Sequence, residues 1–291
     1  MAEHQKGFLE LFTDLLSKME MLDTTDDEKE EKRKLTTQDF ERLSAAYIEE
    51  LVGTTPQPSG GFNILFEKWA QHARKHRYLG FRNVKEDGIS RKYPKEMPDT
   101  SQHLQKWAAK FSNCIPTFPA LLAMVDTHNR IAEVGAGTGY LASLLERVGA
   151  DVVGCDIEPR FGPILKHPIE ALDGRDFIKK NNGFPDRALL ISWGYFTDDI
   201  CEQYEEMVKA YKGDFIFLLG ETMDGCTFSM AKCKPEVSEQ WSVVAVYDLP
   251  SFMDSMIFDQ AVIYQRKNAK KQHVIPSTLR LPKPNKFNKY L

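Results

Sequence analysis

The stretch Glu133-Val134-Gly135-Ala136-Gly137-Thr138-Gly139-Tyr140 places three glycines between two segments of different hydrophobic pattern. Residues 130–132, Arg-Ile-Ala, indicate a short buried strand before it. After it, leucine and valine recur at helical spacing over residues 141–148, and Gly149 follows where a C-cap glycine belongs. We therefore expect the glycines to form a strand-to-helix turn, where the backbone can approach a ligand closely because no Cβ intervenes.

The glycine spacing separates two kinds of nucleotide site. The dinucleotide fingerprint is G-x-G-x-x-G, and its helix N-terminus receives a pyrophosphate. Here the spacing is G-x-G-x-G, and Glu133 stands two residues before the first glycine. A carboxylate there would repel a pyrophosphate but suits the ammonium of a methionine moiety. The pattern favours S-adenosylmethionine (SAM) over a dinucleotide and over a turn that binds no nucleotide.

A second acidic residue ends the next short strand. Residues 151–156 read Asp-Val-Val-Gly-Cys-Asp, and Asp156 lies 17 residues beyond the last glycine. We expect its carboxylate to accept hydrogen bonds from both ribose hydroxyls of the cofactor. Each such charge-assisted bond contributes roughly 1.5–3 kcal/mol.

Residues 133–140 and Asp156 resemble motifs I and II of the class I SAM-dependent methyltransferases. A wider stretch, about residues 110–265, resembles a poorly characterised family within that class. In that family an "IP" dipeptide precedes the glycine loop, an "SWPPY"-like segment ends the fourth strand, and a "GE…GCT"-like segment follows the fifth. The matching segments here are Phe111-Ser112-Asn113-Cys114-Ile115-Pro116, Ser192-Trp193-Gly194-Tyr195, Gly220-Glu221 and Gly225-Cys226-Thr227.

The resemblance implies a fold and a cofactor. The fold is α/β, a Rossmann-like, seven-stranded class I methyltransferase sheet with helices on both faces. The cofactor is SAM, which leaves as S-adenosylhomocysteine (SAH). In this class an acid at the end of the third strand receives the adenine amino group, so Asp173 or Asp176 is the candidate. Either could instead cap the helix that we expect to begin at Phe177. The candidate cofactor-binding residues are Glu133, Gly135, Ala136, Gly137, Gly139, Tyr140, Asp156, Ile157, Asp173, Asp176, Ser192 and Trp193.

The candidate catalytic residues follow two apolar runs. Residues 188–193 and 214–219 are nearly continuous apolar segments, as central parallel strands require, and ligands bind beyond the carboxyl ends of such strands. We expect Tyr195 to face the acceptor and Glu221 to orient or deprotonate it. The alternative role for Glu221 is capping the following turn. The alternative for Trp193 is packing in the core.

The acceptor is less defined than the cofactor. Nucleic-acid amino-methyltransferases use an [ND]-P-P-[YFW] segment after the fourth strand, and Ser192, Trp193 and Gly194 depart from it, which argues against base methylation. We expect a small molecule methylated on nitrogen, oxygen or sulfur by in-line displacement. One alternative is RNA or protein methylation through a basic helix near 62–78 and the basic tail. A groove lined by arginines would favour it, with Arg74, Arg77, Arg82 and Arg91 as its lining. A second alternative is a non-catalytic SAM-binding scaffold.

Composition agrees with a globular enzyme. The 291 residues are 42% hydrophobic and 27% charged, and the net charge of -4 argues against a surface that binds nucleic acid everywhere. No apolar run approaches the ~20 residues that span a bilayer, which predicts no membrane contact. Five scattered cysteines without a CxxC pair predict a reduced, cytoplasmic protein without a metal site.

Patterning divides the chain into three parts. Residues 1–110 form a helical N-terminal region, with helices near 7–22, 37–51 and 62–78 and an acidic linker near 23–34, which we expect to cover the cleft and select the acceptor. Residues 111–265 form the SAM-binding domain, whose last two strands, near 241–247 and 261–265, should pair antiparallel. Residues 266–291 form a basic, proline-containing tail.

Overall fold

The computed structural model describes residues 62–76, 101–160, 168–194, 198–221, 227–250 and 259–269. Several expectations lie outside these residues: the helices near 7–22 and 37–51, the acidic linker, Tyr195 and most of the tail. Of the four arginines of the expected basic groove, Arg77, Arg82 and Arg91 lie outside them too. Arg74 falls within a described helix, but its side chain is not described.

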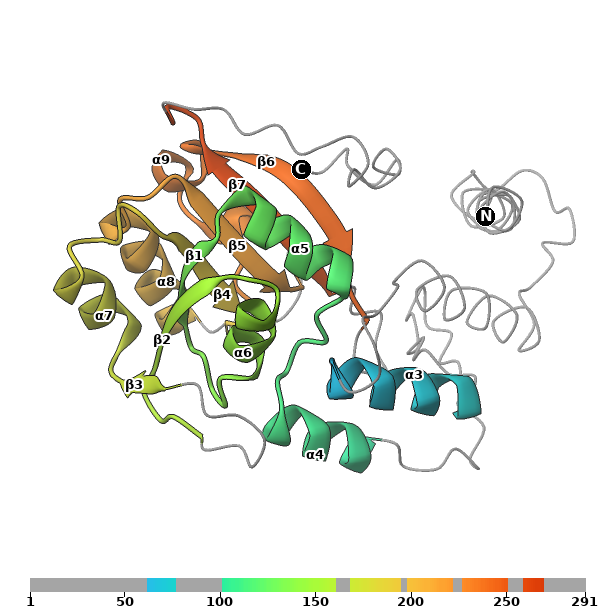
Figure 1. The fold of residues 1–291 in the computed structure, drawn as a ribbon. Coiled ribbons are helices and arrows are strands. Elements are labelled where there is room, and N and C mark those ends of the chain that lie inside the picture. Colours follow the sequence, from blue (N-terminus) through green and yellow to red (C-terminus); the bar gives the residue numbers. More distant parts are fainter. Residues whose placement is uncertain are drawn as a thin grey trace, which may run out of the picture.

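Seven strands form one mixed sheet in the order β3-β2-β1-β4-β5-β7-β6 (Figure 1). The strands are β1 (Arg130–Val134), β2 (Asp151–Asp156), β3 (Ile169–Ala171), β4 (Ala188–Ser192), β5 (Phe215–Gly220), β6 (Trp241–Asp248) and β7 (Gln260–Arg266). Strands β1 to β5 run parallel, and β7 runs antiparallel to both β5 and β6. This is the expected Rossmann-like sheet of class I methyltransferases, including its antiparallel final pair.

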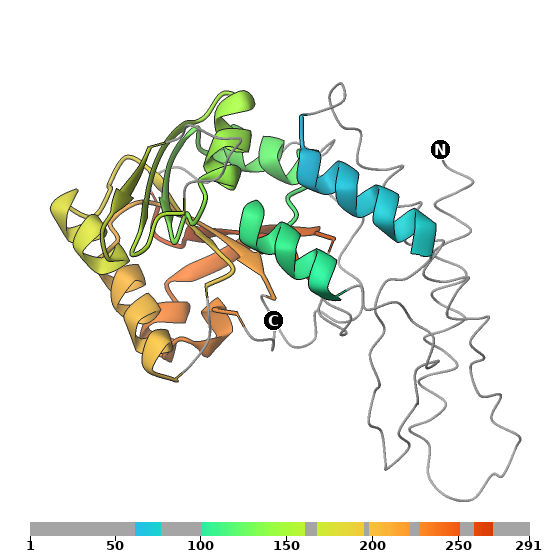
Figure 2. The same ribbon diagram turned by 90° about the horizontal axis from the view of Figure 1, so that it is seen from below.

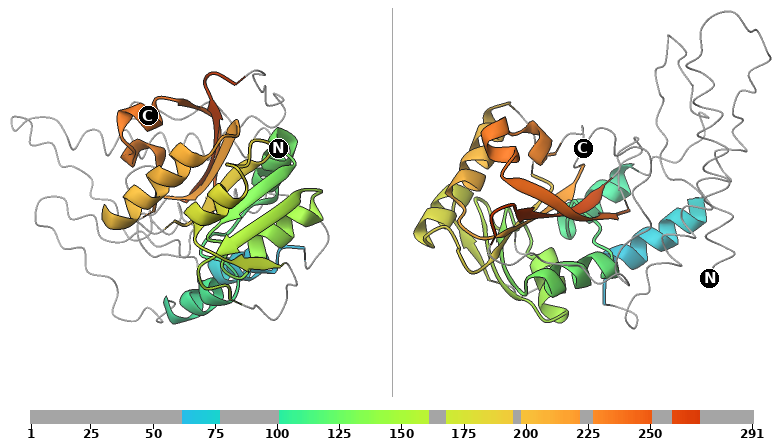
Figure 3. Two further views of the ribbon diagram at one scale, coloured as in Figure 1. Left: turned by 90° about the vertical axis from the view of Figure 1, so that its left-hand side faces the viewer. Right: turned by 90° about the horizontal axis from the view of Figure 1, so that it is seen from above.

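Helices cover both faces of the sheet (Figures 1 and 3). One face carries α5 (Phe118–Thr127) and α6 (Tyr140–Arg147), and the other carries α7 (Gly174–Lys180), α8 (Asp198–Ala210) and α9 (Pro235–Ser238). A short 3-10 helix, η1 (Met230–Lys232), precedes α9. Helices α3 (Ile64–His76) and α4 (Ser101–Lys110) lie side by side next to the α6 side (Figure 2), with Lys68 Nζ 6.0 Å from the Trp107 ring centre. None of the helices in the described ranges is long and apolar enough to cross a membrane.

Side chains of successive residues in the central strands pack alternately into two separate apolar cores, one on each face of the sheet. Phe217 belongs to the cluster under α5 and α6, whereas Ile216 and Leu218 belong to the cluster under α7 and α8. Burial on both faces explains why these strands read as continuous apolar runs. Leu65 and Trp69 of α3 join the first cluster, so this helix shares the core of the sheet.

A buried polar contact fastens α3 to the start of α6. Asn63 is fully buried, and its Nδ2 donates to the Pro116 carbonyl at 2.7 Å. Its Oδ1 accepts from the Tyr140 hydroxyl and from the Phe66 N–H, both at 3.0 Å. The Leu65 N–H in turn donates to the Tyr140 hydroxyl at 3.0 Å. The side chain of Tyr140 therefore serves the junction between α3 and the glycine-loop helix.

Replacing Asn63 by alanine should lower the free energy of unfolding by about 1–3 kcal/mol, because it leaves buried donors and acceptors without partners. Urea unfolding followed by circular dichroism measures this change. Asn129→Ala is the matched control, since Asn129 is exposed, and it should shift stability by less than about 0.5 kcal/mol. Equal effects of the two substitutions would contradict a clamping role for Asn63.

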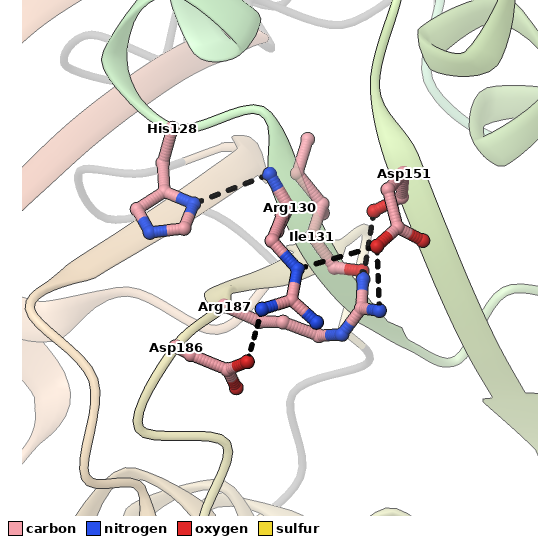
Figure 4. A network of polar contacts seen from close by, with 6 residues as sticks. All are labelled: His128, Arg130, Ile131, Asp151, Asp186 and Arg187. Atoms are coloured by element: carbon pink, nitrogen blue, oxygen red, sulfur yellow. Dashed lines mark hydrogen bonds and ion pairs between the residues drawn. The ribbon is translucent and has the colours of Figure 1, made fainter.

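Ion pairs hold the amino ends of the parallel strands (Figure 4). Asp151 Oδ2 lies 3.3 Å from Arg130 Nε and 2.8 Å from Arg187 Nη2, and Arg130 also pairs with Asp186. His128 Nδ1 accepts from the Arg130 N–H at 3.2 Å. These groups lie where β1 and β2 begin and just before β4, on the edge opposite the glycine loop. Their role is to align strands rather than to bind the cofactor.

Candidate functional site

The turn after β1 has the backbone of a ligand-binding loop. Gly135, Gly137 and Gly139 have φ angles of 73°, 55° and 73°, in the left-handed region that favours glycine. A Cβ added at Gly135 or Gly137 would meet no atom within 4 Å. The N–H groups of Gly135 and Ala136 both donate to the Cys155 carbonyl at 2.9 Å, which fixes the loop against β2. Conformation, not crowding, requires glycine here, and the space beside the loop is open.

Asp156 joins the end of β2 to this loop. Its Oδ2 accepts from the Gly137 N–H and its Oδ1 from the Glu158 N–H, both at 2.8 Å. A carboxylate oxygen can accept more than one hydrogen bond, so each oxygen can still receive a ligand hydroxyl. The adjacent Ile157 is 74% exposed. The carboxylate of Asp156 and the exposed apolar side chain of Ile157 are thus adjacent at the end of β2.

Glu133 is a buried carboxyl beneath the loop, only 1% exposed. Burial raises the pKa of Glu133 to about 8. A hydrogen bond from the Ala142 N–H to the carboxyl opposes this rise, and the charge of Asp156 increases it. Its Oε2 has no hydrogen-bond partner among the described residues. The side chain therefore has unused capacity to bind a donor or a cation.

Unsatisfied polar atoms gather at one edge of the sheet. In the described ranges, the buried side-chain atoms without a hydrogen-bond partner are Glu133 Oε2, Ser192 Oγ and Asp259 Oδ2. Glu133 is near the end of β1, Ser192 ends β4, and Asp259 precedes β7, whose antiparallel direction places its start at the same edge. Because folded proteins satisfy nearly all buried polar groups, these three atoms make this edge of the sheet the candidate ligand site.

The third-strand acids lie in the first turn of α7. The expectation that this helix begins at Phe177 is wrong, since it begins at Gly174. Asp173 is the N-cap: its Oδ1 accepts from the Arg175 N–H at 2.9 Å and pairs with Arg175 Nε at 3.1 Å. Burial by itself would raise the pKa of Asp173, but its hydrogen bonds to Arg175 and the charge of Arg175 hold that pKa below its usual range. Asp173 caps a helix here, and the adenine contact of Asp173 or Asp176 stays a prediction.

Trp193 follows β4 with a backbone conformation that bulky residues rarely adopt, with a φ of 51°. Two hydrogen bonds hold it there: its N–H donates to the Leu219 carbonyl at 2.7 Å, and its Nε1 donates to Asp259 Oδ1 at 3.2 Å. The next residue, Gly194, packs closely on Tyr204, since a Cβ on it would lie 2.7 Å from the Tyr204 ring. This contact leaves no room for a side chain at Gly194.

Asp259 is the functional candidate that the sequence pattern does not reveal. Asp259 is 1% exposed, and burial raises its pKa to about 8. The hydrogen bond from Trp193 lowers this pKa, and the charge of Glu221 raises it further. Its only sequence signal is an acid just before an expected strand, which is common in chains of this composition. The antiparallel pairing of β5 and β7 is what brings it to the site.

Five side chains from four segments meet where β4 and β5 end and β7 begins, and we call them the β4–β7 cluster. They are Cys114, Ser192, Trp193, Glu221 and Asp259. Glu221 is 8% exposed, and its carbonyl accepts from Thr227 Oγ1 at 2.9 Å. Burial, then the charge of Asp259, raises the pKa of the Cys114 thiol; the Ser192 hydroxyl, close by but outside hydrogen-bonding geometry, opposes this rise. The thiol is therefore neutral.

No protein-family model matches the chain, and no curated protein matches it. Solved structures share parts of the fold. One is 1,6-didemethyltoxoflavin-N1-methyltransferase from Burkholderia thailandensis, with 13% identity, covering 65% of this chain and 100% of that one, at a TM-score of 0.39. Another is magnesium protoporphyrin IX methyltransferase from Synechocystis PCC 6803, with 12% identity, 81% and 99% coverage and a TM-score of 0.36.

Human N-acetylserotonin methyltransferase is also similar, with 12% identity, coverage of 80% of this chain and 72% of that one, and a TM-score of 0.36. Identities and TM-scores this low say nothing about acceptor or mechanism. The strand order and the antiparallel final pair establish the fold independently of them. The chain has the Rossmann-like sheet of class I methyltransferases.

Proposed function

We propose that the chain is a SAM-dependent methyltransferase that acts on a small molecule. The observation that carries the proposal is the unpartnered Oε2 of Glu133, buried beneath a loop of three left-handed glycines with open space beside it. SAM supplies an electrophilic methyl group on a sulfonium. Residues at the ends of the first two strands and at the start of α7 would bind its methionine, ribose and adenine parts.

Each part of the cofactor has a partner of matching chemistry. Glu133 would bind the ammonium of the methionine moiety, which would ionise the carboxyl and supply the missing partner. Asp156 would accept the ribose hydroxyls, and Ile157 would pack on the adenine. The glycine loop would lie along the cofactor, with Ala136 and Tyr140 contributing backbone and Asp173 or Asp176 near the adenine amino group.

Burial at the ends of β4 and β5 supports a small acceptor. Glu221 and Asp259 are both buried, and an enclosed pair of carboxyls suits a molecule that enters a pocket better than a strand that crosses a groove. Ser192, Trp193 and Tyr195 would border the transferred methyl. Orientation of the acceptor for in-line attack can contribute roughly 7–11 kcal/mol, so the enzyme needs few chemical groups.

The cofactor is tested by isothermal titration of the full chain with SAM, SAH and NAD. We expect micromolar binding of SAM and SAH and none of NAD. Binding of NAD alone would overturn the proposal. Binding of SAM without methyl transfer to any small molecule, RNA or protein would instead favour the non-catalytic scaffold.

Replacing Glu221 by glutamine should lower turnover at least tenfold and leave SAM affinity within about twofold, because the side chain lies on the acceptor side of the edge. Labelled methyl transfer and calorimetry measure the two quantities. Glu239→Gln is the matched control, since Glu239 is exposed and should change neither. Equal losses of turnover and SAM affinity would place Glu221 at the cofactor.

A further inference from the structure

The glycine loop is held by two different parts of the fold. In its first half, the N–H groups of Gly135, Ala136 and Gly137 all donate to the last two residues of β2. Its second half, Thr138 to Tyr140, is bound instead by residues that precede β1 in the chain, and the bonds are made by side chains. The loop that we propose to hold the cofactor therefore depends on the N-terminal helices as well as on the sheet.

Two hydroxyl groups flank the last glycine of the loop. Thr138 Oγ1 donates to the Phe111 carbonyl. On the other side, the Tyr140 hydroxyl donates to Asn63 Oδ1 at 3.0 Å. Between them, Gly139 is the N-cap of α6 with a φ of 73°, and a glycine has no side chain to cap the first turn as serine or aspartate would. The two neighbouring hydroxyls therefore restrain this turn from both sides.

The same contacts complete the start of α3. Asn63 Oδ1 also accepts from the Phe66 N–H at 3.0 Å, which is the bond of a helix N-cap. The Leu65 N–H donates to the Tyr140 hydroxyl at 3.0 Å. Such N–H groups in the first turn of a helix have no partner within the helix. The Tyr140 hydroxyl is therefore shared: it satisfies the start of α3 and at the same time orients the first residue of α6.

Phe111 connects the loop to α4 in a similar way. Its N–H donates to the Trp107 carbonyl at 2.8 Å, so Phe111 continues the last turn of α4. Its carbonyl accepts from Thr138, and its ring packs edge-on against the Tyr140 ring with the centroids 5.2 Å apart. Phe111 and Tyr140 are each 3% exposed. A shift of α3 or of the end of α4 would therefore reach the glycine loop through buried contacts.

We propose that Thr138 and Tyr140 are positioning residues of the cofactor site, which set the conformation of the glycine loop by fastening it to α3 and to the end of α4. This inference rests on the proposed function, because it takes the loop to bind SAM. Cofactor binding and the packing of α3 are then linked, and such a linkage is reciprocal. A change that loosens α3 weakens the binding of SAM and SAH, and bound cofactor stabilises α3.

The test compares two buried tyrosine hydroxyls in the full chain. Tyr140→Phe removes the shared hydroxyl and keeps the ring. Tyr211→Phe is the matched control, because the Tyr211 hydroxyl is also buried and lies 2.7 Å from the carbonyls of both Arg187 and Phe215. These carbonyls lie where β4 and β5 begin, at the edge of the sheet opposite the glycine loop. The control therefore removes comparable hydrogen bonds away from the proposed cofactor site.

Both substitutions should lower the free energy of unfolding, measured with urea, because each removes buried hydrogen bonds. Only Tyr140→Phe should also weaken the binding of SAH, by three- to tenfold in calorimetry. A Tyr140→Phe variant that binds SAH within twofold of the wild type, or an equal loss of affinity in Tyr211→Phe, would overturn the inference alone. A wild-type chain that does not bind SAH would overturn the proposed function, and this inference with it.

Thr138 provides an independent test on the other side of Gly139. Thr138→Val keeps the shape of the side chain but removes the donor to the Phe111 carbonyl, and it should weaken SAH binding three- to tenfold. Thr138→Ser keeps the hydroxyl and should recover most of that affinity. Equal SAH affinities of these two variants would mean that the hydroxyl does not position the loop, and would contradict the assignment.

Hydrogen exchange measures the linkage in the opposite direction. Saturating SAH should slow the exchange of amides in α3 at least threefold more than that of amides in α8, which lies on the other face of the sheet. In Tyr140→Phe this difference between the two helices should disappear. Equal slowing of α3 and α8 in the wild type would mean that α3 responds only to the overall gain in stability, and would refute the coupling.

Discussion

Substituting Asp156 by alanine is expected to weaken SAM binding by at least tenfold and on the order of a hundredfold. The carboxylate would accept two ribose hydroxyls, and each charge-assisted bond is worth roughly 1.5–3 kcal/mol. The same side chain holds the Gly137 N–H at 2.8 Å, so its loss also loosens the glycine loop. Calorimetric titration of the variant with SAM measures the effect.

The control for this experiment lies at the other end of the same strand. Asp151 begins β2 and pairs with Arg130 and Arg187, far from the loop. Asp151→Asn should leave SAM affinity within twofold, even if it lowers stability slightly. Circular dichroism should show both variants folded. An Asp156→Ala variant that binds SAM as tightly as the wild type would remove this residue from the cofactor site.

The sequence predicts the central sheet well because its strands are buried on both faces. Residues 188–193 and 214–219 read as apolar runs, and β4 and β5 lie within a residue of them. The expected strand at 151–156 coincides with β2. The glycine loop can also be predicted from the sequence, because only glycine adopts its three left-handed φ angles without strain.

Local pattern fails where a long-range contact decides the outcome. Helix α7 begins three residues before the expected Phe177, because Asp173 caps it with a side-chain bond that periodicity does not show. Tyr140 bonds to Asn63, 77 residues away in the chain. Asp259 enters the site through strand pairing and lies 66 residues from its partner Trp193. Such contacts depend on topology, which single-sequence patterns determine only coarsely.

The stability of the ligand-free protein is expected to fall as the pH rises from about 5 to 8. Burial raises the pKa of both Glu133 and Asp259 to about 8, whereas carboxyls in an unfolded chain titrate at about 4. Between these values the native state holds protons that the unfolded state has lost. The free energy of unfolding therefore decreases through this window and levels off above it. Each group contributes on the order of 3–5 kcal/mol, at 1.36 kcal/mol per pKa unit.

Urea unfolding at several pH values measures how the free energy of unfolding decreases with pH. Two substitutions show how much each carboxyl contributes to that decrease. Glu133→Gln and Asp259→Asn should each remove about half of the decrease, and the double variant should lose the decrease altogether. It should keep only the smaller, opposite slope from His128, whose pKa is lowered by burial. Asp248→Asn, an exposed carboxyl, should keep the full slope. A wild-type stability that stays constant between pH 5 and 8 would mean that neither carboxyl is held protonated in the folded chain.

A calorimetric titration with SAH distinguishes the two carboxyls by which of them loses its proton. If Glu133 binds the ammonium of the cofactor, SAH binding must displace the proton from Glu133 and leave the one on Asp259 in place. Below pH 8, binding should therefore release about one proton, seen as a dependence of the calorimetric heat on the buffer. The release should vanish in Glu133→Gln and persist in Asp259→Asn. The reverse result would exchange the roles of the two carboxyls, placing the cofactor ammonium at β7 and the acceptor at β1.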